Sequence, residues 1–238
     1  MRQRLVIAIL AASMLPTMGF AQALPDMGAM SNGVGKNAIS LMVLLTALSL
    51  APALAIMVTC FPFVVTVLSI LRQSIGLQQS PPNMLIVSLA MFLTWFVMQP
   101  VLDDFWRVAG QPLWNGEMPI EDALSLGIPP FRAFMELRVD PETLARFAEI
   151  APGPDAAPDR LSVLIPAFMV SEIQRAFEIG FLVALPFLII DLVVSAVLMS
   201  MGMMMLPPAV VALPFKLAFF AVVDGWTLIS TALVRGYQ

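Results

Sequence analysis

Long apolar tracts separated by short polar segments dominate the pattern along this chain. After an N-terminal segment, four such tracts run at about 38–71, 84–102, 161–206 and 207–234. A helix rises 1.5 Å per residue, so about 20 apolar residues cross a hydrocarbon core of ~30 Å. Backbone groups in lipid need partners within their own segment, and no strand-like alternation competes with a helical interpretation. The pattern predicts an all-α membrane protein.

The first and third tracts are too long for one straight crossing. The first contains Pro52 and Pro62, and it must break, tilt or leave the membrane. The third ends in LMSMGMMML, where Gly202 loosens the helix before Pro207 and Pro208 end it. Methionine is flexible and polarizable, so this cluster has three interpretations: ordinary apolar filling, a Cu(I) site, or a deformable seal around a passage.

A short polar segment from Arg72 to Asn83 separates the first two tracts. It holds the sequence QQSPP, in which the prolines stop one helix before the next begins. This segment predicts the turn of a helical hairpin. The residues expected to form that turn are Gln78, Gln79, Pro81 and Pro82.

A longer polar region, 103–160, holds 11 of the 16 acidic residues against five arginines. Within it, Asp140, Pro141 and Glu142 are typical of an N-cap, a first-turn proline and a first-turn acid, and they predict a helix through Glu149. An acidic loop is expected outside the cell membrane, opposite lone Arg72.

The N-terminus has the features of a targeting signal. Arg2 and Arg4 precede a short apolar run, and small residues permit cleavage after Ala21 or Ala23. An uncleaved anchor is the alternative, but the apolar run before Pro16 is short for a membrane span. Cleavage would insert the chain with its mature N-terminus outside.

Six charged residues lie inside the apolar tracts, where a charge at the centre of a spanning helix costs about 2.5–3.5 kcal/mol. Three of them follow at steps of three and share one helix face. These side chains need partners within the chain, partners in other copies, or water. Ion pairs between helices, a proton or ion relay, and the lining of a wet conduit are all compatible with them. The six are Glu172, Arg175, Glu178, Asp191, Lys216 and Asp224.

Composition narrows the function classes. Sixty per cent of the residues are hydrophobic and 12% are charged, against roughly 25% charge in soluble domains. The chain has no His and a single Cys, Cys60, so the usual metal-ligand sets and His-dependent catalytic pairs are excluded. A net charge of −4 gives no electrostatic basis for binding nucleic acid. The chain is expected to be no enzyme and to carry no cofactor or metal.

Several sequence blocks are similar to one known family. PAFMVSEIQRAFEIGF, residues 166–181, resembles its signature almost residue for residue, and ILRQSIGLQQSPPN, residues 70–83, resembles its first block. LPFLIIDLVVSAVLMSMGMMMLPP from Leu185 and ALPFKLAFFAVVDGW to Trp226 match further blocks. By this resemblance the chain is identified as a member of the FliP family of type III secretion export gates. The signal and the acidic region are similar to its flagellar branch.

The resemblance implies an assembly and a mechanism. About five copies would join FliQ and FliR in a funnel of bent helical hairpins, through which unfolded flagellar proteins cross the bacterial inner membrane, with part of the assembly in the periplasm. Energy would come from an ATPase and a proton-driven membrane component. The methionine loop would close the passage as a gasket formed by Met203, Met204 and Met205.

The resemblance also implies that charged positions contact neighbouring copies. These are Glu172, Arg175, Glu178, Lys216 and Asp224, and we expect Glu172 to pair with Lys216. One departure stands out, because Phe63 occupies a position where relatives usually carry a basic residue.

The expected organisation is a signal peptide (1–21), a short extracytoplasmic segment (24–37), a first hydrophobic hairpin (38–101), an acidic periplasmic region (102–160) and a second hairpin with the methionine loop (161–238). The main alternative function is an ion-coupled transporter that uses the intramembrane carboxylates as proton sites. A Cu(I) handler ranks below it, and a membrane enzyme ranks last because no nucleophile–base set is present.

Overall fold

The structure is a computed structural model, and it describes residues 42, 45–46, 49–50, 52–76, 81–152, 160–203 and 205–237. The expected signal peptide, the segment 24–37, and Gln78, Gln79 and Met204 lie outside these residues. The chain divides into two units, Met1–Ala51 and Pro52–Gln238. The described residues of the first unit are helical. All elements named below belong to the second unit.

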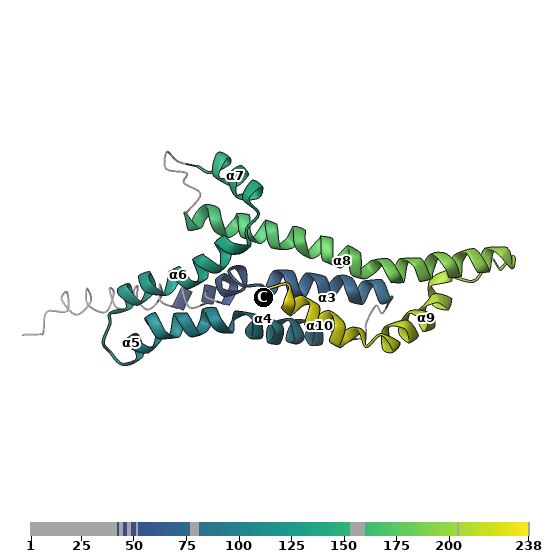
Figure 1. Ribbon diagram of the computed structural model, residues 1–238, viewed down its shortest axis with the longest axis horizontal. Helices are drawn as coiled ribbons and strands as arrows, with labels where there is room; N and C mark the ends of the chain where they lie inside the picture. Colours follow the sequence, from purple (N-terminus) through teal and green to yellow (C-terminus); the bar gives the residue numbers. More distant parts are fainter. Residues whose placement is uncertain are drawn as a thin grey trace, which may run out of the picture. The chain divides into compact units, whose positions relative to one another are not determined.

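The second unit is built from helices, and no strand occurs among its described residues. This confirms the predicted all-α class. Residues 52–57 are also helical. In chain order (Figure 1) the elements are α3 (Phe61–Ile75), α4 (Asn83–Phe105), the π-helical turn η1 (Trp106–Gly110), α5 (Gln111–Trp114), α6 (Ile120–Arg138), α7 (Pro141–Ile150), α8 (Leu161–Ser200), α9 (Pro208–Val222) and α10 (Gly225–Arg235).

The first apolar tract breaks, as predicted. Residues 58–60 are not helical, and α3 then begins with Pro62 in its first turn. Backbone N–H groups in the first turn have no partner within the helix, so a proline there costs no hydrogen bond. The helix ends at Gly76, whose φ of 91° lies in the left-handed region that favours glycine. The Gly76 N–H donates to the carbonyl of Gln73 at 3.0 Å and closes the helix end.

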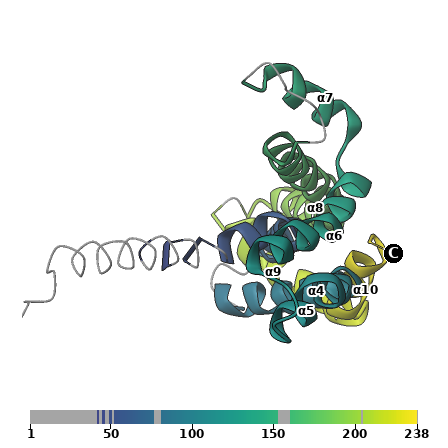
Figure 2. The same cartoon turned by 90° about the vertical axis from the view of Figure 1, so that its left-hand side faces the viewer.

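Helix α8 organises the second unit. Its 40 residues correspond to about 60 Å, roughly twice the thickness of a hydrocarbon core. It contacts α3, α6, α7 and α9, and in Figure 1 it runs alongside α3 and continues past the end of that helix toward α9. Figure 2 shows α4 and α10 on the face opposite α7. The core of the second unit therefore lies between α3, α8, α4 and α10.

Two of the described helices are long and apolar enough to cross a membrane. They are the continuous helix 83–114, which comprises α4, η1 and α5, and α8. A third candidate arises if α9 and α10, which meet at a 62° bend, count as one broken span. Only about a fifth of each long apolar window is buried within the chain, so most of its apolar surface faces outward.

The acidic region contains more helix than the sequence indicated. Helix α7 confirms the prediction from Asp140, whose carboxylate accepts the N–H of Thr143 at 2.8 Å. Helix α6 was not predicted, because it contains Pro129 and Pro130 and an interior proline costs about 3 kcal/mol. Its aromatic residues pack against the core, and this burial offsets the lost hydrogen bonds.

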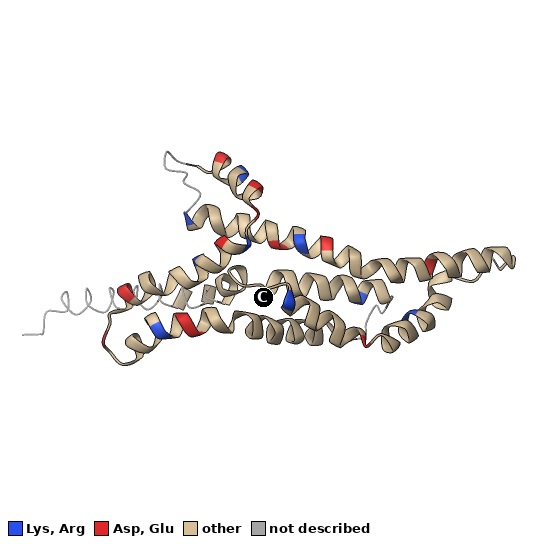
Figure 3. Cartoon of the chain, viewed as in Figure 1, with Lys and Arg blue, Asp and Glu red and all other residues tan. Residues whose placement is uncertain are grey.

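Charge is distributed unevenly over the second unit. In Figure 3 most charged residues lie on α6, α7, the end of α4 and the first half of α8, whereas α9 and α10 carry few. Within the described part of α9, Lys216 is the single charged residue. A buried charge on an otherwise apolar helix needs a partner of opposite charge, and the partner of Lys216 is part of the candidate site.

Candidate functional site

The methionine-bearing loop between α8 and α9 is held by the hydrogen bonds that end α8. The N–H of Gly202 donates to Met199 O at 3.1 Å, and the N–H of Met203 donates to Leu198 O at 3.0 Å. With Gly202 at φ 74°, this is a Schellman motif, in which a left-handed residue reverses the chain and satisfies the last carbonyls. Pro208 then starts α9 in its first turn. Helix α8 therefore ends at Ser200 through Gly202, earlier than expected, because the prolines at 207 and 208 were predicted to end it.

The loop methionines are exposed to different degrees. Met205 is almost fully exposed, at 99%, whereas Met203 is 39% exposed. Met199 and Met201, at the end of α8, are also exposed. Met204 lies outside the described residues. The loop thus presents flexible thioether side chains outward from a fixed helix end.

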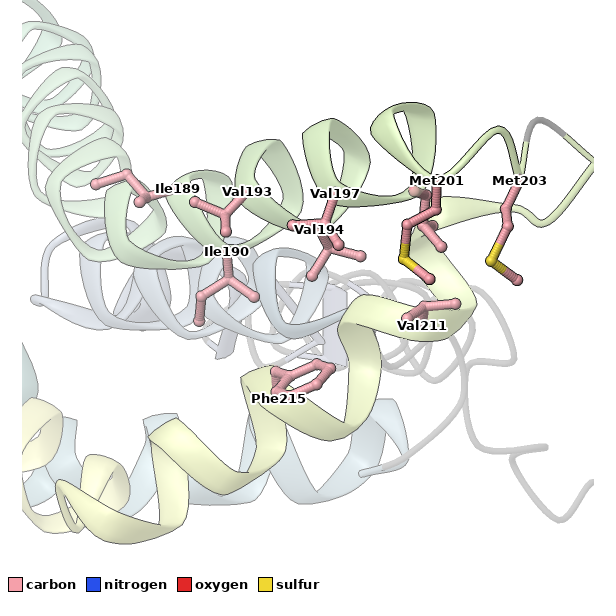
Figure 4. A pocket seen from close by; sticks show the side chains of 10 residues that line it. Ile189, Ile190, Val193, Val194, Val197, Met201, Met203, Val211 and Phe215 are labelled. Atoms are coloured by element: carbon pink, nitrogen blue, oxygen red, sulfur yellow. The ribbon is translucent and has the colours of Figure 1, made fainter.

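An apolar groove of about 540 Å³ lies beside the loop. Every residue that lines it is apolar, and Figure 4 shows Met201 and Met203 extending from the end of α8 and the loop toward α9. The lining residues are Ile189, Ile190, Val193, Val194, Val197, Leu198, Met201, Met203, Val211 and Phe215. The loop therefore lies beside a space that no polar side chain lines.

A buried lysine fixes α9 behind the groove. Lys216 Nζ lies 2.6 Å from Asp191 Oδ2 of α8 and donates to Ser74 O of α3 at 2.9 Å. The Lys216 side chain is 8% exposed and that of Asp191 is 39% exposed. A buried ammonium is costly without such partners, so this pair fixes where α9 meets α8 and α3.

A second ionic cluster surrounds Glu172, which has no exposed surface. Its Oε1 lies 3.5 Å from Arg138 Nε at the end of α6 and 3.9 Å from Arg175 Nη1 on its own helix. The hydroxyl of Tyr237, just after α10, donates to Oε2. Within the chain, Glu172 pairs with Arg138 and Lys216 pairs with Asp191, and the expected pairing of Glu172 with Lys216 between neighbouring copies stays a prediction.

Arg175 and Glu178, the other two charged residues on this face of α8, are more exposed than Glu172. Arg175 is half-buried and lines a small polar notch of about 110 Å³ together with Asp140, Ser171, Gln174 and Glu178. Exposed Glu178 accepts a hydrogen bond from Gln174 Nε2 at 3.3 Å. Both positions remain candidates for contacts with other copies.

Asp224 marks the bend between α9 and α10. It is exposed, and its φ of 49° is the one positive value among the described non-glycine residues. Gly225 follows, and a Cβ there would meet the ring of Phe220 at 2.1 Å. The bend is thus fixed by the backbone, while the Asp224 carboxylate remains accessible to a partner.

The predicted hairpin turn is described only in part. Arg72 of α3 reaches across it, and its Nη1 donates to Asn83 Oδ1 and, at 3.5 Å, to Pro81 O. Pro82 precedes α4 directly. Arg72 thereby ties the end of α3 to the start of α4.

Two residues of the Glu172 cluster carried no signal in the sequence. Arg138 appeared as one of several arginines in an acidic region, and Tyr237 lies in a short segment without a motif. Phe63 also adjoins this cluster, because it is buried and its ring packs edge-on against Tyr237 at 5.4 Å. Arg138 and Tyr237 are far from Glu172 in sequence, so residue spacing alone could not have paired them with it. Among the described residues, no group of three His, Cys, Asp or Glu side chains could hold a metal ion.

Known proteins match nearly the whole chain. The model of the FliP family matches residues 44–233. The flagellar biosynthetic protein FliP of Caulobacter vibrioides is 46% identical over 238 residues, covering 98% of this chain and 89% of its own length. The FliP proteins of Aquifex aeolicus (43% identical, all of both chains) and Rhizobium meliloti (48% identical, 82% of this chain and 81% of its own) are similar over comparable lengths.

Proposed function

Because this chain belongs to the FliP family, we propose that it is a core subunit of the flagellar type III protein-export gate. In this proposal about five copies join FliQ and FliR around a channel for unfolded flagellar proteins, in the bacterial inner membrane and partly in the periplasm. The observation that carries the proposal is 46% identity to a flagellar biosynthetic protein FliP over 98% of the chain.

The apolar outer surface supports an assembly. Large side chains on the outer face of α4, such as Phe92, Trp95 and Phe96, are 60% exposed or more. Exposed apolar patches of this extent mark contacts with lipid or with other proteins. Helix α8 carries Glu172, Arg175, Glu178 and Asp191, so every 20-residue window along it contains a charge. Neighbouring subunits or water around such charges would cost less free energy than lipid.

The methionine loop supports a gating role. A seal around a moving chain needs side chains that repack at low cost, and methionine has three rotatable bonds and no branch. The loop lies beside an apolar groove, between the Schellman motif that ends α8 and Pro208 in the first turn of α9. In the proposed gate Met203, Met204 and Met205 close the passage between export events.

Deleting the gene tests the proposal at the level of the cell. We expect a deletion strain to build no filaments and to recover them when the chain is supplied from a plasmid. Filaments on the deletion strain would rule out the proposal. Growth and inner-membrane integrity should stay normal, which separates loss of export from general damage.

Replacing the three loop methionines tests the gasket. We expect a variant with Met203, Met204 and Met205 changed to Ala to assemble normally but to leak ions, measured as conductance of cells or reconstituted complexes. The control changes exposed Met84 and Met91 to Ala, both on α4 and away from the loop. Unchanged conductance in a normally assembled loop variant would contradict the gasket.

The transporter alternative has less support. It needs intramembrane carboxylates that exchange protons, yet Glu172 and Asp191 each form an ion pair with a cationic side chain, and Glu178 and Asp224 are exposed on the surface of the chain. Mass measurement of the complex purified in detergent separates the two functions. A gate subunit should purify as a multimer with its partners, whereas a small self-contained unit would favour transport.

A further inference from the structure

Tyr237 lies where four helices meet. Its ring packs edge-on against Phe63 of α3 and is stacked on Phe134 of α6, with ring centroids 6.2 Å apart and planes 13° apart. Its hydroxyl donates to Glu172 of α8. One side chain that follows α10 thus contacts α3, α6 and α8 together.

Arg138 holds the same segment from the end of α6. Its guanidinium carbon lies 3.9 Å from the centroid of the Tyr237 ring, a cation–π geometry. Its Nη1 donates to Gly236 O at 2.8 Å, at the end of α10 where the helix dipole places partial negative charge. Its Nε faces Glu172 at 3.5 Å. Arg138 therefore contacts both the carboxylate and the segment that covers it.

The buried carboxylate makes these contacts depend on each other. Glu172 is fully buried, and a buried charge that loses a partner destabilises a protein strongly. Apart from Arg175 on the same helix, the polar partners of Glu172 come from α6 and from the segment after α10. Burial and the nearby carboxylate raise the pKa of Tyr237 above its usual value, so the phenol stays protonated and remains a donor.

We propose that Arg138, Glu172 and Tyr237 form a lock that docks α6 and the end of α10 onto α8 as one cooperative unit. Opening either contact removes a partner from Glu172 and so weakens the other. Coupling between two sites is reciprocal, so α6 and the end of α10 should loosen together whichever is perturbed. This lock is independent of the export function, because it concerns only contacts inside one chain.

Hydrogen exchange of the full chain in detergent, followed by mass spectrometry, tests the lock. We expect Tyr237→Ala to speed exchange of the α6 amides by about tenfold or more, since it removes a hydrogen bond to a charged group and a packed ring. Arg138→Met should likewise speed exchange at the end of α10. Amides of α9, which the lock does not touch, should exchange at the parent rate. Trp114→Ala, at an aromatic residue that is 83% exposed, is the matched control.

Two results would overturn the lock. One is faster exchange confined to residues 235–237 with α6 unchanged, and the other is a uniform increase over all helices. If Tyr237→Ala does not fold, Tyr237→Phe removes the hydroxyl alone and should still loosen α6 by a smaller factor. In the double variant Y237F/R138M, the effect on α6 should be less than the product of the single effects, whereas a simple product would show that the contacts are independent.

Discussion

The parts of α8 before and after Phe187 are both largely apolar but have different surroundings. The half before Phe187 buries a residue at nearly every turn against α3, α6 and α7. Beyond Phe187, Leu198 is the single buried residue of the helix, and side chains such as Leu192 and Val193 are more than half exposed. Hydrophobicity alone therefore does not decide which part of a membrane helix is core.

Small residues distinguish the two halves. The buried face of the first half contains Ala167, Ser171, Ala176, Gly180 and Ala184, spaced four or five apart. Such a stripe lets another helix approach closely, as in membrane helix pairs. A Cβ on Gly180 would meet Ile70 of α3 at 2.4 Å. The second half has no comparable stripe, so its apolar surface remains available to the loop, the groove and other subunits.

The largest expected difference concerns one residue from each part of α8. Phe168, before Phe187, is fully buried, and Leu192, beyond it, is 71% exposed. Phe168→Ala should lower the free energy of unfolding by about 3–5 kcal/mol, because it leaves a cavity. Leu192→Ala should change it by less than about 0.5 kcal/mol. Unfolding of the isolated chain in detergent, followed by circular dichroism, measures both, and equal effects would contradict the comparison.

A second pair of variants tests the small-residue stripe. Gly180→Val forces a side chain into the contact with α3 and should destabilise the chain by about 1–3 kcal/mol. Ala196→Val, at an exposed position of the second half, should stay within about 0.5 kcal/mol of the parent. Thermal unfolding in detergent compares them. A tolerated Gly180→Val would show that α3 can move away without loss.

The end of α8 should respond to backbone conformation rather than to packing. Gly202→Ala places a Cβ in the left-handed region and should cost about 1–2 kcal/mol, although no atom lies within 4 Å of that Cβ. Gly202→Asn should cost less, because asparagine adopts this conformation more readily. Proteolysis in the loop reports local opening. Equal behaviour of the Ala and Asn variants would contradict the assigned cause.

The smallest effect is local to α7, which packs on the first half of α8. Hydrogen bonds from the Thr143 backbone and hydroxyl lower the pKa of Asp140 below its usual value. The ionised carboxylate therefore stabilises the folded cap above pH ~4, and this contribution is lost as pH falls further through the lowered pKa.

We expect exchange of the α7 amides, corrected for intrinsic rates, to speed up as pH is lowered below ~4. Asp140→Asn keeps a capping side chain without the titration, so its corrected rates should stay flat with pH. A slope in the Asn variant equal to that of the parent would assign the effect to another group.

The sequence predicted those helices whose start, end or apolar character is set by residues close together in the chain. The apolar tracts predicted the membrane helices, and Asp140 and Pro141 predicted α7. A break between the third and fourth tracts was also predicted, although Gly202 ends α8 before the prolines are reached. Helix α6 was missed, because the local cost of two prolines is offset by aromatic residues that pack against distant helices.

The same distinction between local and long-range signals applies to the candidate site. The methionine loop follows from neighbouring Gly and Pro residues, so its position was predictable. The ion pairs were not, because Glu172 meets Arg138 and Tyr237, and Lys216 meets Asp191, across 25 to 65 residues of sequence. A charge in an apolar tract indicates that a partner exists but does not identify it.

Because of the Schellman motif at Gly202, the point at which α8 ends does not depend on which side chains the loop between α8 and α9 carries. Helix α8 completes its last hydrogen bonds with backbone atoms, and α9 starts on Pro208, so no side chain between them is needed to end or begin a helix. Exposed Met205 can therefore be exchanged for a shorter, bulkier or polar residue at little cost in folding free energy. Evolution, or an engineer, can change this position without rebuilding the two helices that the loop connects.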